Sequence, residues 1–193
     1  HGFTGPNTSV STACATGAYA IGEGPRLVRE GDQGWERVGE AVHGYLALPL
    51  RMLDAEQRER AARRLVQRWS VERMLGADAL SGAGRAWQDH LEARFPGAEE
   101  LTEQPITWWN EEDQVMEGWI DTLLRLPSGE IVLVDHKSYP GEDPVGHVRR
   151  NYLGQMATYS RALAAAGRTP ARILMHLPLR GEVVEIELAA NAR

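Results

Sequence analysis

The sequence of 193 residues contains little cysteine and no long apolar segment. Its single cysteine, Cys14, has no partner for an internal disulfide and cannot supply a four-cysteine zinc or iron–sulfur site. We therefore expect no iron–sulfur cluster and a reducing, cytoplasmic location. No apolar run approaches the roughly 18 residues of a membrane span, and the first residues lack the pattern of a signal peptide. The sequence thus predicts no association with a membrane.

Lysine is almost absent as well. Of the 21 Lys and Arg residues, only Lys137 is a lysine. One interpretation is that a general bias toward arginine has replaced lysine wherever either residue serves. The other is that Lys137 occupies a position that needs a compact ammonium group rather than a planar guanidinium. The count alone leaves both interpretations open.

The net charge of −6 is distributed unevenly along the chain. Residues 99–143 are strongly acidic, whereas residues 51–73 are rich in arginine. An acidic total argues against a freestanding nucleic-acid-binding protein, which is usually basic. It does not argue against carboxylates that hold a divalent cation, because the cation supplies positive charge locally. The arginines of the basic stretch form either a phosphate-contacting surface or a solvated helix face, and they are Arg58, Arg60, Arg63, Arg64 and Arg68.

The amino-terminal part of the chain divides into two regions. Residues 1–34 begin with His, are crowded with small residues and show no sustained periodicity, which predicts a linker or a poorly ordered arm of an excised fragment. Residues 35–193 then form the expected folded domain. Apolar residues at helical spacing predict helices over 35–48, over 55–75 with Asp54 as N-cap, and over 82–94.

Strand-forming residues dominate the middle of the chain. They predict strands over 101–109, 115–126 and 130–137, then a long helix over 145–166 that ends at Gly167, and strands over 171–177 and 182–188. The expected fold class is α/β, with a mixed central sheet flanked by helices and an N-terminal helical section.

The short connection between the second and third strands fixes their register. If the loop 127–129 closes with Leu126 opposite Glu130, then Asp121 lies opposite Asp135. Directly opposed residues point to the same face of a sheet with Cβ atoms about 5 Å apart, and Lys137 shares that face because strand side chains alternate. Two carboxylates and one ammonium group therefore converge.

The residues around these aspartates are apolar on both faces of the strands, as in a strand covered on both sides. Two facing carboxylates in such a place repel, and one is driven toward protonation unless a cation neutralises them. A divalent cation with oxygen ligands, Mg²⁺ or else Mn²⁺, does so, and the alternative is a salt bridge from Lys137 to one aspartate. A cation held by two Asp beside a Lys suits phosphodiester hydrolysis.

Four segments occur in an order and spacing that carry a family resemblance, namely Gly39–His43, Gly118–Asp121, Val134–Ser138 and Gln155–Tyr159. Over residues 35–188 the chain resembles the RecB-type branch of the PD-(D/E)XK nucleases, which includes the nuclease domains of RecBCD and AddAB helicase-nucleases. The resemblance implies a restriction-endonuclease-like fold and a magnesium-dependent deoxyribonuclease, similar to exonuclease V, in DNA end processing and recombinational repair. It implies DNA as the substrate and a helicase, fused upstream or as a subunit, as the partner.

The resemblance also implies roles for individual residues. His43, Asp121 and Asp135 would be metal ligands, the carbonyl of His136 a further ligand, and Lys137 the catalytic lysine beside the two aspartates. On its own, His43 could equally be a histidine that packs in the core or on the surface.

Three further residues have supporting roles by resemblance. Gln155 and Tyr159 match a QxxxY motif that contacts DNA or braces the site, although their spacing on one helix face suits plain packing as well. Glu103 stands where the family often places an acidic residue near the metal, or it is a solvated edge residue. The competing functional hypothesis is an inactive nuclease-like domain that serves as a DNA-binding or protein-docking module.

Overall fold

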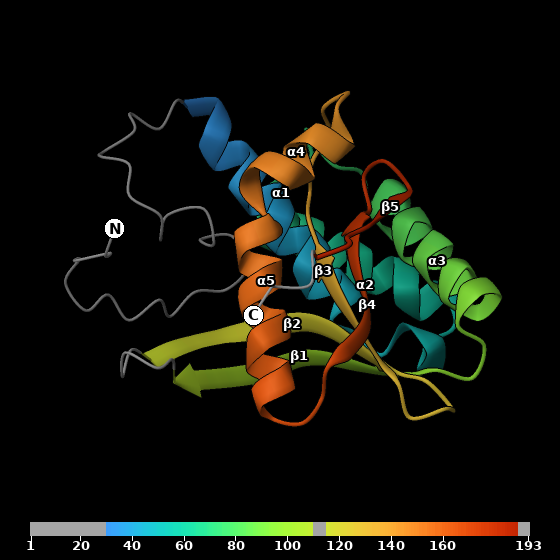
Figure 1. Cartoon of the computed structure of the whole chain (residues 1–193). Helices are drawn as coiled ribbons and strands as arrows, with labels where there is room; N and C mark the ends of the chain where they lie inside the picture. Colours follow the sequence, from blue (N-terminus) through green and yellow to red (C-terminus); the bar gives the residue numbers. More distant parts are fainter. Residues whose placement is uncertain (1–29, 110–114, 189–193) are drawn as a thin grey trace.

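The computed structural model describes residues 30–109 and 115–188, and the side chains from residue 34 onward. The predicted arm therefore lies outside the described residues as far as residue 29, whereas residues 30–34 belong to the first helix. The elements run in the order α1 (Glu30–Leu46), η1 (Leu50–Met52), α2 (Ala55–Arg68), α3 (Ala77–Arg94), β1 (Glu99–Trp109), β2 (Val115–Arg125), β3 (Ile131–His136), α4 (Pro144–Asn151), α5 (Leu153–Ala165), β4 (Pro170–Leu177) and β5 (Glu182–Glu185) (Figure 1).

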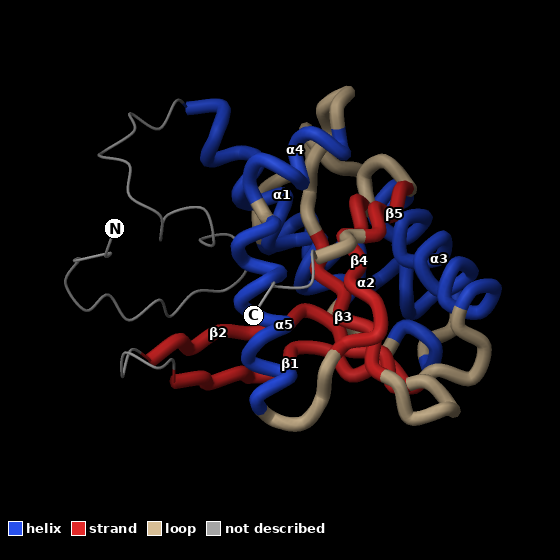
Figure 2. Tube along the Cα trace, viewed as in Figure 1, coloured by secondary structure: helices blue, strands red, loops and turns tan. Residues whose placement is uncertain are grey.

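The five strands form one mixed sheet in the order β1-β2-β3-β4-β5. Only β3 and β4 pair in parallel, and the other neighbours are antiparallel. This arrangement confirms the predicted α/β class with a mixed central sheet and an N-terminal helical section. In Figure 2, α5 crosses in front of the strands.

Two hydrophobic cores cover the two faces of the sheet. Val132 and Val134 of β3 pack with the apolar residues of α1, α2 and α3, whereas Leu133 between them packs with Met156 and Leu163 of α5. Alternation along a strand explains this division, because successive side chains point to opposite faces. β3 is therefore covered on both sides, as its continuous apolar sequence predicts.

The register predicted for the β2–β3 hairpin is confirmed. The amide of Leu126 donates to the carbonyl of Glu130, and Thr122 pairs with Val134. Gly129 has a φ of 87°, which a residue without a Cβ adopts at little cost. The β2–β3 ladder ends at Thr122, so the next pair of positions is Asp121 and Asp135.

The single helix predicted over 55–75 is wrong in its length, because α2 ends at Arg68. Ser70 has a φ of 54°, its amide donates to the carbonyl of Gln67, and the amide of Val71 donates to the carbonyl of Val66. These two hydrogen bonds define a Schellman motif, which usually has glycine at the left-handed position. Here the left-handed residue is a serine, so the sequence does not indicate the end of the helix. The predicted start is confirmed, because Asp54 forms a capping box with Gln57.

The long helix predicted over 145–166 is two helices, α4 and α5, which break at Tyr152. Tyr152 has a φ of −124°, and its ring lies 5.1 Å from the Nζ of Lys137, a cation–π distance. The apolar spacing continues through the break, so the sequence pattern does not reveal it. Gly167, with a φ of 73°, follows the end of α5 as predicted.

The remaining boundaries differ by a few residues. The helix predicted over 35–48 runs from Glu30 to Leu46, the helix predicted over 82–94 begins at Ala77, and the last strand ends at Glu185 rather than at 188. None of the described helices is long and apolar enough to cross a bilayer.

Candidate active site

Asp121 lies where β2 and β3 stop pairing. Its Oδ2 accepts a hydrogen bond of 2.7 Å from the backbone amide of His136, so a side chain replaces the next rung of the ladder. The same oxygen lies 3.4 Å from Nδ1 of His43, on α1. Asp121 is 2% exposed. The predicted meeting of a helix histidine with a strand aspartate is therefore present in the structure.

Asp135 and Lys137 form an ion pair at the end of β3. Nζ of Lys137 lies 2.6 Å from Oδ2 of Asp135, and both side chains are buried. Nε2 of Gln155 donates to the other oxygen, Oδ1, at 3.4 Å and also to the hydroxyl of Tyr159 at 3.2 Å. The two ends of the Gln155–Tyr159 motif thus contact each other, and Gln155 contacts the carboxylate. The salt bridge that the sequence left as an alternative is present.

Charges within this cluster affect one another strongly. Burial raises the pKa of Asp135; the positive charge of Lys137 opposes that rise, and the negative charge of Asp121 adds to it. Burial, and next the charge of Lys137, lowers the pKa of His43 to about 4. His43 is therefore neutral near pH 7 and keeps a nitrogen lone pair. A cluster that holds repelling carboxylates and a neutral imidazole is the kind of environment found at functional sites.

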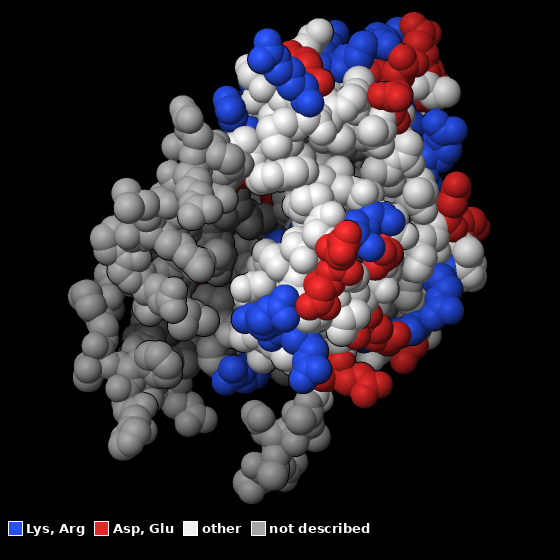
Figure 3. All heavy atoms as spheres, turned by 90° about the horizontal axis from the view of Figure 1, so that it is seen from above, with Lys and Arg blue, Asp and Glu red and all other residues white. Residues whose placement is uncertain are grey.

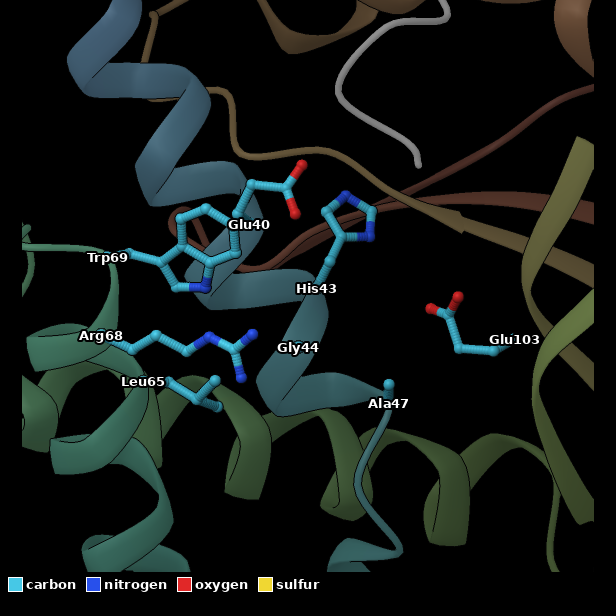
Figure 4. A pocket seen from close by; sticks show the side chains of 8 residues that line it. All are labelled: Glu40, His43, Gly44, Ala47, Leu65, Arg68, Trp69 and Glu103. Carbon is cyan, nitrogen blue, oxygen red and sulfur yellow. The ribbon is translucent and has the colours of Figure 1, made fainter. Parts of the chain in front are cut away.

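Glu103 faces the same region from β1, where its φ of 51° interrupts the pairing with β2 opposite Asp121. Burial, and then the charges of Asp121 and Glu40, raises the pKa of Glu103. Figure 4 shows the carboxylate of Glu40 beside the imidazole of His43 and the carboxylate of Glu103 reaching toward them from the strand. Glu103 is thus an exposed residue of the edge strand β1, as the alternative interpretation held, and it also lines the same pocket as His43.

The side chain of His136 lies at the margin of this cluster, with its ring 6.3 Å from the ring of His43 between centroids. Its hydrogen-bonding partners are other residues: Nδ1 is 2.9 Å from Nδ1 of His176, and Nε2 is 3.2 Å from the hydroxyl of Thr122. The indole of Trp87 stacks on His176 with 4.3 Å between centroids. The backbone of His136 nevertheless remains at the site through its amide bond to Asp121. Metal ligation by its carbonyl stays a prediction.

The chemistry of the donors fits a hard divalent cation. Asp121 and Asp135 supply carboxylate oxygens, and His43 supplies a neutral imidazole nitrogen. The side-chain oxygen of Gln155 is buried beside Asp135 and has no hydrogen-bond partner within the described ranges. In those ranges no three His, Cys, Asp or Glu side chains are already gathered at ligating distance, and Asp135 is paired with Lys137.

Several neighbours of the cluster were not predicted as site residues. Glu40 is three positions before His43 on α1, a spacing that places both on one helix face and could have indicated it. No sequence spacing or motif indicates that Tyr152 and His176 lie near the cluster. Their roles depend on the break between the last two helices and on the parallel pairing of β3 with β4.

One family model matches most of the chain. The family model described as PD-(D/E)XK nuclease superfamily matches residues 12–190. No curated protein matches the chain. A solved structure titled "Crystal structure of SSO0001" is similar at 12% identity with a TM-score of 0.36, over 77% of this chain and 75% of that one.

Proposed function

The chain belongs to the PD-(D/E)XK nuclease superfamily, and from this premise we propose that it hydrolyses phosphodiester bonds of DNA with a divalent cation, most naturally Mg²⁺. The observation that carries the proposal is that two contacts, His43 with Asp121 and Asp135 with Lys137, adjoin where β2 and β3 stop pairing. A purely structural ion pair needs only Asp135 and Lys137. Clustering a second carboxylate and a neutral imidazole there is costly without a ligand.

We propose that His43, Asp121 and Asp135 hold the cation. When bound, it supplies Lewis-acid polarisation of the phosphodiester and lowers the pKa of a water molecule. Glu103 lies close enough to add negative charge, and the carbonyl of His136 is a further candidate ligand. Mn²⁺ has the same preference for oxygen ligands and should substitute for Mg²⁺.

Lys137 supplies the second part of the chemistry. Its ammonium is held against Asp135 by the 2.6 Å contact and by the ring of Tyr152, so it is oriented before the substrate arrives. A donor fixed in this way can stabilise the negative charge that develops on the phosphoryl oxygens during attack. Gln155 orients Asp135, and Tyr159 in turn orients Gln155.

We further propose that the chain is of the RecB type, with exonuclease activity like that of exonuclease V, in a cytoplasmic helicase-nuclease of DNA end processing and recombinational repair. The support is the placement of four ordered motifs on α1, β2, β3 and α5 around one cluster. A helicase domain or subunit would then be the partner that delivers DNA to this site.

The test is digestion of linear double-stranded and single-stranded DNA by the wild-type protein, with Mg²⁺ and then with EDTA. We expect cleavage that EDTA stops and that Lys137→Ala or Asp135→Ala abolishes, while circular dichroism shows the folded state in each variant. DNA binding without any metal-dependent cleavage would contradict the proposal and favour an inactive docking module. Cleavage by either variant at the wild-type rate would contradict the roles given to these residues.

A further inference from the structure

A pocket beside the candidate active site is not explained by the hydrolytic residues. It has a volume of about 270 Å³, near the lower end for ligand pockets, so it suits a ligand of one nucleotide rather than a larger molecule. One wall consists of His43, Glu40 and Glu103, which belong to the site or adjoin it. Another wall is formed by Arg68 and Trp69, at the end of α2 (Figure 4).

Arg64 and Arg68 are the arginines of α2 without an ion pair or hydrogen bond to the described residues, and of these two only Arg68 lines the pocket. Arg60 and Arg63 are paired with Glu56 and Glu59 on the helix surface. Arg68, by contrast, makes no ion pair or hydrogen bond with the residues that the structure describes, and its guanidinium lies 5.9 Å from the ring centre of Trp69. A cation that is not neutralised locally and lies next to an aromatic ring can contact a phosphate while the ring receives a base.

Trp69 presents only part of its indole to the pocket, since its other side packs against the helical core. An indole anchored in this way offers a flat apolar surface that loses little freedom when a base stacks on it. Stacking requires a base that is not enclosed in a duplex, so the matching ligand is single-stranded.

The two carboxylates of the pocket limit how a nucleotide can lie. Glu40 and Glu103 repel a phosphate, so the phosphate must lie at the Arg68 wall. Carboxylates accept hydrogen bonds from exocyclic amino groups of bases, which places the base edge toward them. Basic and acidic side chains alternate over the face shown in Figure 3 and the net charge is −6, so we expect a local cation such as Arg68 rather than the overall charge to attract the phosphate.

We propose that this pocket binds one unpaired nucleotide of a DNA strand next to the bond to be cleaved, with the base on Trp69 and its phosphate on Arg68. The inference rests on the proposed function, because the pocket shares His43 with the hydrolytic cluster. It assigns substrate positioning to the end of α2, where neither residue matches any of the four motifs.

The test is fluorescence anisotropy of a labelled single-stranded oligonucleotide in EDTA, where metal-dependent cleavage cannot occur. Arg68→Ala should weaken binding about tenfold and reduce the slope of log affinity against log salt by about 0.7, the value for one phosphate contact on a single strand. Arg63→Ala is the matched control, because it removes the same charge from another face of α2. It should change the affinity less than twofold and leave the slope unchanged.

Trp69→Leu should weaken binding about tenfold, whereas Trp69→Phe should keep most of the affinity, because leucine fills space but cannot stack. Thermal denaturation of each variant identifies any loss due to unfolding. Equal affinities of Arg68→Ala, Trp69→Leu and Arg63→Ala, or no binding by the wild type, would overturn the pocket assignment. The predicted pattern in a protein that never cleaves DNA with Mg²⁺ would leave the pocket assignment intact and overturn only the nuclease proposal.

Discussion

The carboxyl-terminal end of β3 carries two buried clusters on its opposite faces, and only one of them is charged. On the face toward α5, Asp135 is paired with Lys137. On the other face, His136 contacts His176, and burial lowers the pKa of both imidazoles, that of His176 to about 3. Residues next to one another in the sequence therefore belong to an ion-paired cluster and to a cluster of neutral imidazoles, which adjoin where the ring of His43 lies 6.3 Å from that of His136.

The difference between the two clusters indicates what each contributes. Both ring nitrogens of His136 have hydrogen-bond partners, His176 and the hydroxyl of Thr122, so the ring needs no ligand to satisfy its polar atoms. In the other cluster Asp121 brings a second buried carboxylate near Asp135 and raises its pKa. A satisfied polar network rigidifies a core, whereas a cluster of repelling charges persists in a fold where ligand binding uses it.

The largest expected effect is on activity. Asp121→Asn keeps an oxygen for the amide of His136 but removes the charge, so the fold should persist while the cleavage rate falls by about 10³-fold, a loss of about 4 kcal/mol in transition-state stabilisation. Initial rates on linear DNA and a urea melt of the same preparation measure the two quantities. If Asp121→Asn lost as much free energy of unfolding as transition-state stabilisation, the charged cluster would serve the fold as much as the reaction. The distinction between a functional cluster and a structural cluster would then be lost.

The neutral cluster should respond in the opposite way. His136→Ala leaves a cavity under Trp87 and leaves His176 without a partner, and we expect a loss of about 3 kcal/mol in the free energy of unfolding. Urea denaturation measures this loss, and His90→Ala, at the partly exposed edge of the cluster, is the control with about 1 kcal/mol or less. The rate per folded molecule should change only a few-fold. A loss of activity at full stability would show that His136 acts in the chemistry itself.

A smaller effect is expected from Gln155, which joins the charged cluster to α5. Gln155→Leu removes the hydrogen bonds to Asp135 and Tyr159 and should reduce the cleavage rate about tenfold, a loss of about 1.4 kcal/mol. Tyr159→Phe removes only the hydroxyl and should cost a few-fold. Rates measured at saturating DNA separate this effect from DNA binding. If Tyr159→Phe were the more severe change, the motif would not act through Asp135.

The smallest effect is expected far from both clusters. Asp54→Ala removes the capping box of α2 and should lower the free energy of unfolding by about 1 kcal/mol. The cleavage rate at a temperature where the variant is fully folded should equal that of the wild type. A changed cleavage rate in this variant would contradict the prediction. It would mean that losing the cap at the start of α2 also displaces Arg68 at the end of the helix.

The sequence predicted the parts of this architecture that depend on local rules. The loop between Leu126 and Glu130 fixed the register that brings Asp121 level with Asp135, and this register is confirmed. Element order and fold class followed from periodicity. The approach of His43 to Asp121 came from motif resemblance, because no local rule sets the position of α1 relative to the sheet.

What the sequence did not predict depends on tertiary packing. Helix α2 stops after Arg68 because Ser70 adopts a left-handed conformation. The break between α4 and α5 at Tyr152 places the ring of that residue over Lys137. The spacing of apolar residues changes at neither position, so it predicts neither feature. The pairing of His136 with His176 requires the parallel neighbour β4, which is 40 residues away in the chain. The pocket wall at Trp69 likewise arises only when α2 packs beside α1.

Titration of Mn²⁺ into the protein, followed by electron paramagnetic resonance of the free ion, tests the central claim most directly, because it detects the cation without relying on activity. The account predicts one tight site per chain in the wild type, strongly weakened in Asp121→Asn and in Asp135→Asn, and unchanged in the surface control Asp78→Asn. Equal Mn²⁺ binding by the wild type and by both cluster variants, or none in the wild type, would contradict the claim that these side chains gather to hold a metal.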